Sequence, residues 1–138
     1  MTTAAGRERL RFLDFEFERL PNGRYRARVV LEGSPGDRFV GTAEGLGSQA
    51  GELRCAAEAA TDALRGAVQE KLAFELLGVK AVRAFDSTVV IVAISCHNGM
   101  PATRLVGSCL TDEAPHRCAA LAVLNATNRF LGNIIFTR

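Results

Sequence analysis

The chain lacks several features that would assign it a function directly. Its 138 residues include no tryptophan, one tyrosine and two histidines, and neither a CxxC nor an HxxxH spacing is present. Without these zinc-ligand spacings we expect no bound metal, and no motif indicates another cofactor. No apolar run approaches the roughly 18 residues that a membrane span requires, so we expect no membrane partner.

The four cysteines are interpreted as reduced thiols. The N-terminal segment has no apolar signal-peptide core, which predicts a cytoplasmic protein. Cys55 and Cys118 are interpreted as small packing residues. Cys96 with the adjacent His97 would suggest a nucleophile and a base, but neighbours along a strand point to opposite faces. We therefore assign no catalytic residue.

Uncompensated charge is also scarce, because the formal net charge is only +2. Seven of the arginines precede residue 29, which alone would suggest a nucleic-acid surface. Acidic residues alternate with them, namely Glu8, Asp14, Glu16 and Glu18. Binding to a polyanion needs charge that is not neutralised in this way, so we expect no nucleic-acid partner.

An internal repeat organises the sequence. Arg117-Cys118-Ala119-Ala120 repeats Arg54-Cys55-Ala56-Ala57, and six of fifteen positions are identical between residues 53–67 and 116–130. A strand end precedes each copy, Phe39-Val40-Gly41-Thr42 and Leu105-Val106-Gly107-Ser108. Because the helix segment and the strand end before it are both repeated, the sequence predicts a duplicated structural unit, with residues 53–67 and 116–130 both helical.

The first two strands are predicted at residues 10–20 and 24–32, where apolar and charged residues alternate. Pro21-Asn22-Gly23 suits a three-residue hairpin loop, which fixes a register in which paired residue numbers sum to 44. Glu18 then faces Arg26 and Glu16 faces Arg28. The arginines are therefore interpreted as an exposed cross-strand ion ladder rather than a polyanion site.

The remaining pattern completes two βββα units. A third strand is expected at residues 38–43 and a helix at 52–68; strands follow at 74–85, with a bulge at residues 76–78, and at 89–96 and 103–110, before the last helix. We predict one α+β domain over residues 1–138, with antiparallel sheets, helices packed on one face and pseudo-two-fold symmetry. Its parts are a flexible segment at 1–9, units at 10–70 and 71–131, and a tail at 132–138.

A tandem βββα chain of this size resembles the C-terminal regulatory domain of α-isopropylmalate synthase, over roughly residues 10–131. The residues that carry the resemblance are Gly45-Leu46-Gly47 before the first helix and Ala122-Val123-Leu124-Asn125 in the last. The resemblance implies paired βββα units that dimerise and bind an end-product amino acid between them.

We expect a non-catalytic small-molecule-binding or dimerisation module with a regulatory role. The alternatives are a small enzyme whose site is assembled across subunits, and a structural assembly subunit. If a small-molecule effector binds, we expect it at the two loops that precede the helices, near Gly45, Gly47, Ser48, Thr111 and Asp112. These loops offer free helix N-terminal amides and backbone room.

We also expect a homo-oligomer, most simply a dimer. The strand Val89–Ile94 is apolar on both faces, so a second surface should cover it. Leu121 lies off the apolar stripe of the last helix. The expected interface residues are Val90, Val92, Ile94 and Leu121.

Overall fold

The computed structural model describes residues 10–33, 36–68, 73–97 and 101–134, with side chains as far as Asn128. Along the chain these residues form β1 (Arg11–Arg19), β2 (Arg24–Glu32), β3 (Arg38–Leu46), α2 (Gln49–Val68), β4 (Ala73–Ala84), β5 (Ser87–His97), β6 (Thr103–Thr111) and α3 (Pro115–Ile134). The strands make two antiparallel sheets, in the orders β1-β2-β3 and β4-β5-β6. This is the tandem βββα fold that the repeat predicted. No helix in these ranges combines the length and apolar content needed to cross a membrane.

The first hairpin has the register predicted from its loop. Its pairs are Glu18 with Arg26, Glu16 with Arg28, Phe17 with Ala27, and Phe15 with Val29. Gly23 has a φ of 78°, the left-handed conformation expected of the last loop residue. A loop shorter by one residue would have set acidic side chains against apolar ones, so the loop length determines the chemistry of each face.

Both units have a bulge in their first strand. In β4 the register shifts between Leu76 and Gly78, as predicted. β1 has an equivalent shift between Phe12 and Asp14, which the sequence analysis did not anticipate. The extra residue of β1 is Leu13, and its side chain is 39% exposed. The alternation of residues 10–20 predicts that Leu13 lies on the buried face with the other apolar residues; this is wrong, because the bulge interrupts the alternation there.

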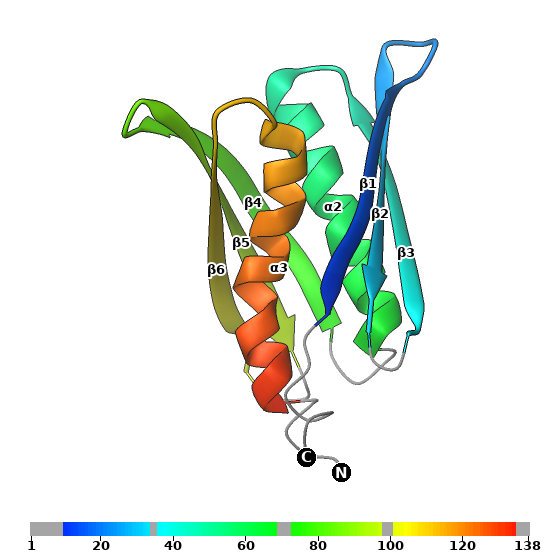
Figure 1. The fold of residues 1–138 in the computed structure, drawn as a ribbon, viewed down its shortest axis with the longest axis vertical. Coiled ribbons are helices and arrows are strands. Elements are labelled where there is room, and N and C mark those ends of the chain that lie inside the picture. The colour runs from blue at the N-terminus through cyan, green and yellow to red at the C-terminus, as the bar shows by residue number, and fades with distance from the viewer. Residues whose placement is uncertain (1–9, 34–35, 69–72, 98–100, 135–138) are drawn as a thin grey trace.

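The two helices lie side by side between the two sheets (Figure 1). α2 covers β2 and β3, and α3 covers β5 and β6, so each helix packs on one face of its own sheet. Each helix also contacts the first strand of the other unit, α2 with β4 and α3 with β1. These exchanged contacts produce the expected pseudo-two-fold arrangement and join the units around one core.

Two glycines let the helices approach the strands closely. Gly41 in β3 and Gly107 in β6 occupy equivalent positions in the two units. A Cβ on Gly41 would overlap the backbone of Ala59 and Ala63, and one on Gly107 would overlap the corresponding backbone of α3. The alanines shared by the two helices therefore pack directly on strand backbone.

Each helix also sends one polar side chain to the outer strand of its own sheet. Asp62 Oδ2 accepts the backbone N–H of Thr42 at 3.1 Å, and Asn125 Oδ1 accepts that of Ser108 at 3.2 Å. These pairs occupy equivalent positions in the duplication. A carboxylate and an amide can replace each other here because only an acceptor oxygen is needed.

Both helices are longer than predicted. The Ser48 carbonyl accepts the N–H of Glu52 at 2.7 Å and its hydroxyl accepts that of Gly51 at 3.0 Å, so Ser48 caps α2. The expected start near Glu52 is wrong by one turn. α3 continues to Ile134, so the expected tail is wrong for residues 132–134. The expectations for residues 1–9, for the junction at 70–71 and for residues 135–138 of the tail lie outside the described residues.

Candidate functional site

The outer faces of the two sheets, which point away from the helices, differ in chemistry although their strands are equivalent. In the first sheet the register aligns Glu18, Arg26 and Glu44 across the three strands. The Arg26 guanidinium lies 3.2 Å from Glu44 and 3.1 Å from Glu18, and hydrogen bonds to Glu44 and then Glu18 raise its pKa. Arg28 forms a longer ion pair with Glu16, at 3.8 Å. The expected ion ladder is therefore confirmed.

The equivalent row of the second sheet is apolar. Its register aligns Val82, Val89 and Leu110, at the positions that the first sheet gives to its ion triplet. Ile91 replaces Arg28 in the next row. Val106 and Leu110 are 63% and 58% exposed. We call this surface the outer face of β4–β6; apolar side chains gathered on one exposed face are typical of an interaction site.

Three of the four predicted interface residues lie on the other side of β5, whereas Leu121 lies in α3. Val90, Val92 and Ile94 are fully buried inside the monomer and belong to the core around the helices. A partner cannot reach them, which corrects the expected interface. Strand alternation places Val89 and Ile91 outward instead. Because the strand is apolar on both sides, periodicity alone could not tell which set faces the helices.

One end of the outer face of β4–β6 is polar. The register aligns Glu75, Ser95 and Arg104 there, with both charged side chains exposed. The Ser95 hydroxyl lies 3.1 Å from Nε2 of His97. A Cβ on Gly78 of the edge strand β4 would meet no atom within 4 Å. The face is thus largely apolar, with Lys80 on β4 and two further charges at one end.

An exposed phenylalanine lies at the other end of this face. Phe85 and Asp86 form the two-residue loop between β4 and β5, so β4 ends one residue before the predicted end of this strand, and Phe85 is 90% exposed. Their φ angles are 55° and 60°, a left-handed conformation that a bulky side chain adopts at a cost. The tip of this hairpin projects away from the helices (Figure 1).

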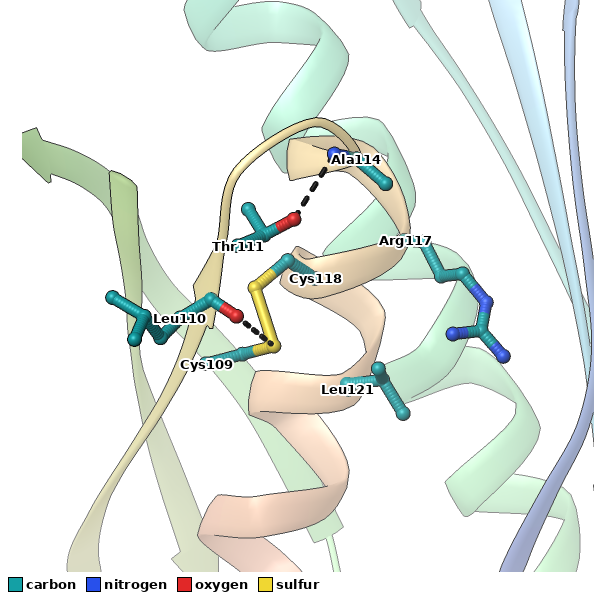
Figure 2. A pocket seen from close by; sticks show the side chains of 7 residues that line it. All are labelled: Cys109, Leu110, Thr111, Ala114, Arg117, Cys118 and Leu121. Carbon is teal, nitrogen blue, oxygen red and sulfur yellow. Dashed lines mark hydrogen bonds between the residues drawn. A yellow bond between two sulfur atoms is a disulfide. The ribbon is translucent and has the colours of Figure 1, made fainter. Parts of the chain in front are cut away.

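A groove with a volume of about 150 Å³ lies where β6 meets α3 (Figure 2). Its lining consists of Cys109, Leu110, Thr111, Ala114, Arg117, Cys118 and Leu121. Leu110 also belongs to the outer face of β4–β6, so the apolar surface continues around the edge of the sheet to Leu121. The Arg117 guanidinium carbon lies 4.9 Å from the ring centre of Phe12, which engages it with the first unit.

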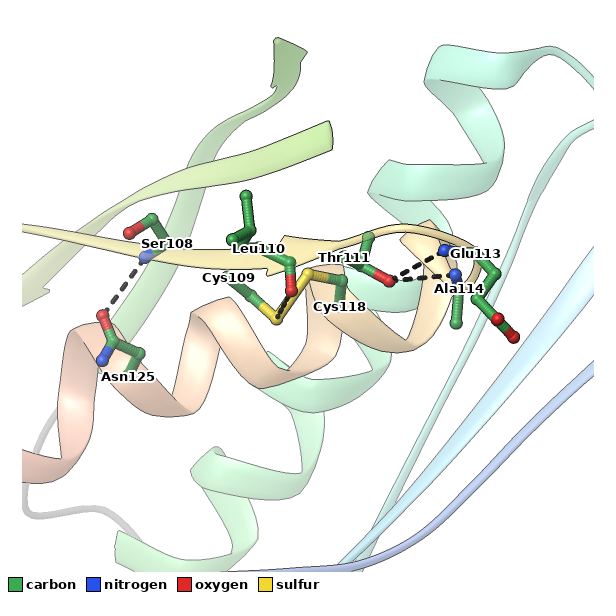
Figure 3. Close-up of a disulfide and its surroundings, with 8 residues drawn as sticks. All are labelled: Ser108, Cys109, Leu110, Thr111, Glu113, Ala114, Cys118 and Asn125. Atoms are coloured by element: carbon green, nitrogen blue, oxygen red, sulfur yellow. Dashed lines mark hydrogen bonds between the residues drawn. A yellow bond between two sulfur atoms is a disulfide. The ribbon is translucent and has the colours of Figure 1, made fainter. Parts of the chain in front are cut away.

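A disulfide joins Cys109 in β6 to Cys118 in α3, with 5.5 Å between their Cα atoms (Figure 3). The expectation of four reduced thiols is wrong for this pair, and Cys118 is more than a packing residue. Four reduced thiols therefore no longer support the predicted cytoplasmic location. Cys55 and Cys96 are free and buried, and burial raises the pKa of both thiols.

The first loop predicted to bind a ligand is filled by its own chain. A Cβ on Gly47 would overlap the carbonyl of Gly23, and one on Gly45 would crowd the carbonyl of Gly51. The Ser48 hydroxyl already accepts a helix amide. The backbone room that these glycines were expected to offer a ligand is therefore used by the fold.

The second predicted loop is partly engaged as well. The Thr111 hydroxyl accepts the N–H groups of Glu113 and Ala114, at 3.3 and 3.0 Å (Figure 3). Asp112 accepts a hydrogen bond from the Ser87 hydroxyl. Of the five residues proposed for a ligand, only Thr111 lines the groove.

Contacts at the N-terminal ends of the two helices were missed by the sequence analysis. Nε2 of His116 lies 2.6 Å from Oε1 of Glu52, and the imidazole stacks on Phe17 with ring centres 4.3 Å apart. Phe17 in turn stacks on Tyr25 at 5.0 Å. The row of phenylalanines on β1 could have indicated these contacts, because buried aromatic rings pack against apolar or aromatic side chains of another element.

Among the described residues, no group of three or more histidine, cysteine, aspartate or glutamate side chains is placed to hold a metal ion. No protein-family model matches the sequence, and no curated protein matches it either. The outer face of β4–β6 and the adjoining groove are therefore the surfaces from which a function can be inferred.

Proposed function

We propose that the protein is a dimerisation module that binds a second copy of itself through the outer face of β4–β6. The main support is that equivalent outward-facing positions carry charged side chains on the first sheet and apolar side chains on the second. Glu18, Arg26 and Glu44 form an ion triplet on the first sheet, whereas Val82, Val89 and Leu110 occupy its place on the second. The two units share the same βββα backbone, so folding of the monomer does not explain why one sheet has charged and the other apolar side chains at these positions.

A second copy is the occupant that best fits the size and chemistry of this face. Three strands of about nine residues span roughly 450 Å² of flat area per copy. Two copies, with the added relief of side chains and the overhanging Phe85, come close to the ~1,000 Å² that a specific interface needs. Self-association also requires a self-complementary patch, and an apolar area with charges of both signs at its margin meets that condition.

Self-association fits the surfaces better than binding of a small molecule or catalysis. The groove of about 150 Å³ is smaller than the roughly 300–1,000 Å³ typical of ligand sites. Its polar side chains are engaged within the fold, Thr111 with the backbone N–H groups of Glu113 and Ala114, and Arg117 with Phe12. A regulatory effect would arise if a small effector entered the groove, because Leu110 belongs to both the groove and the proposed interface.

The resemblance to the regulatory domain of α-isopropylmalate synthase also favours this proposal, because it implies paired βββα units that dimerise. It implies an amino-acid effector too, but the filled loop at Gly45 and Gly47 argues against the site expected for one.

The test is sedimentation of the wild-type protein at micromolar concentration, where we expect twice the monomer mass of 14.8 kDa. Val106→Asp should raise the dissociation constant about a hundredfold, because it places an unpaired carboxylate in the interface. The matched control is Val40→Asp, at the equivalent and 50% exposed position of the first sheet, which should leave association unchanged. A monomeric wild type, or equal effects of the two substitutions, would contradict the proposal.

A further inference from the structure

We infer that the two-fold axis of the dimer runs parallel to β5, so that β4 of each copy lies over β6 of the other. This inference rests on the proposed function, since it concerns how two outer faces meet. Two sheets that pack face to face can be related by an axis along the strands or by one across them. The two choices bring different side chains together, and the charges on the face distinguish them.

With the axis along the strands, each row of the sheet meets the same row of the partner. Glu75 on β4 then lies over the partner subunit's Arg104 on β6, and Arg104 lies over the partner subunit's Glu75. The apolar row that contains Val82 and Leu110 meets its own copy. Every charge at the polar end therefore has a partner of opposite sign.

With the axis across the strands, the rows exchange ends. Glu75 and Arg104 would then lie against the partner's apolar row, which contains Val82 and Leu110. Each of these two charges would then face an apolar row with no partner of opposite sign. The arrangement along the strands pairs both charges and is the one that the distribution of side chains favours. Lys80 faces an uncharged residue of the partner in both arrangements, so it does not distinguish them.

The same axis also accounts for the exposed loop between β4 and β5. It brings Phe85 over the end of the partner's β6, beside Leu110 and the groove that Leu121 lines (Figure 2). An axis across the strands would instead place Phe85 near the polar end that contains Ser95. Packed sheets cross at about 30°, a rotation that long glutamate and arginine side chains can span at the margin.

Reversal of the paired charges tests the orientation. Glu75→Arg and Arg104→Glu should each raise the dissociation constant about tenfold or more, because each creates two like-charge contacts per dimer. The double variant Glu75→Arg/Arg104→Glu restores opposite charges and should return the constant to within about threefold of wild type. Lys80→Glu is the control, since Lys80 would face the partner's uncharged Ser108 and should have little effect.

The outcomes separate this inference from the proposed function. Rescue in the double variant supports the axis along β5. A double variant that associates no better than the weaker single variant overturns that axis, while the dimer of the wild type still stands. A wild-type protein that sediments as a monomer overturns both.

Discussion

The thiol of Cys55 donates a hydrogen bond to the backbone carbonyl of Ala43 at 3.2 Å. The equivalent residues of the second unit are Cys118 and Cys109, which form the disulfide. A single difference, alanine against cysteine on the outer strand, thus decides whether a helix is covalently tied to its sheet. The first unit is a natural control for the second.

Ala43→Cys should therefore form a second disulfide with Cys55. Closing this loop should raise the free energy of unfolding by about 2–3 kcal/mol in the oxidised protein. Urea unfolding with and without reductant measures the gain, and a thiol count shows whether the bond has formed. Ala43→Ser serves as the control, and it should show no new response to reductant. If Ala43→Cys retains three free thiols, the two units are not equivalent at this site.

Gly107→Ala should cost at least about 3 kcal/mol of unfolding free energy, because its Cβ would overlap the backbone of Ala122 and Ala126. Helix and strand backbones cannot move aside as a flexible side chain could. Gly78→Ala is the matched control on the same sheet, since its Cβ meets nothing within 4 Å, and it should change the free energy by less than about 0.5 kcal/mol. Chemical denaturation of both variants measures these free energies of unfolding. Similar losses in the two variants would contradict the close packing of α3 on β6.

Stability should fall at alkaline pH because burial raises the pKa of Cys55 and Cys96. Above the ordinary thiol pKa of about 8.5, the unfolded chain loses thiol protons that the folded chain still holds. The thiols therefore leave the free energy of unfolding unchanged below that pH and lower it as the pH rises further. Urea midpoints between pH 7 and 10 measure the slope. The variant Cys55→Ala/Cys96→Ala should show a shallower decline, and an identical one would contradict the assignment.

Phe85→Asn should stabilise the monomer while weakening self-association. Asparagine adopts the left-handed conformation of this position more easily, which should add about 1 kcal/mol to the free energy of unfolding. Unfolding is best measured in the Val106→Asp background, where the protein should be monomeric. Loss of the exposed ring should raise the dissociation constant of the otherwise wild-type protein. Leu46→Asn removes a comparable 67% exposed side chain from the first sheet and should do neither.

Local patterns were sufficient to predict much of the fold. The loop at Pro21–Gly23 fixed the register of the first hairpin, because loop length and strand alternation allow one pairing of acids with arginines. The repeat predicted the order of elements, since two matching strand ends precede two matching helices. The bulge of β4 was predicted from its irregular alternation, whereas that of β1 was missed because Leu13 continues an apparently regular pattern.

The candidate site needed three-dimensional information. β5 is apolar on both sides, so its sequence is compatible with either Val90 or Val89 facing the helices. The disulfide was missed because Cys118 matches Cys55 in the repeat, and only the position of α3 over β6 brings it to Cys109. The room at Gly45 and Gly47 was assigned to a ligand, although the chain itself occupies it.

The acceptors on Asp62 and Asn125 have a consequence for how assemblies can grow. An outer strand normally offers unpaired backbone groups to another chain, and strand addition of that kind leads to fibres. Asp62 occupies a donor on β3 and Asn125 occupies one on β6. With one amide of β3 and one of β6 occupied in this way, strand addition at these two edges is discouraged, which leaves face-to-face packing as the route to the proposed dimer.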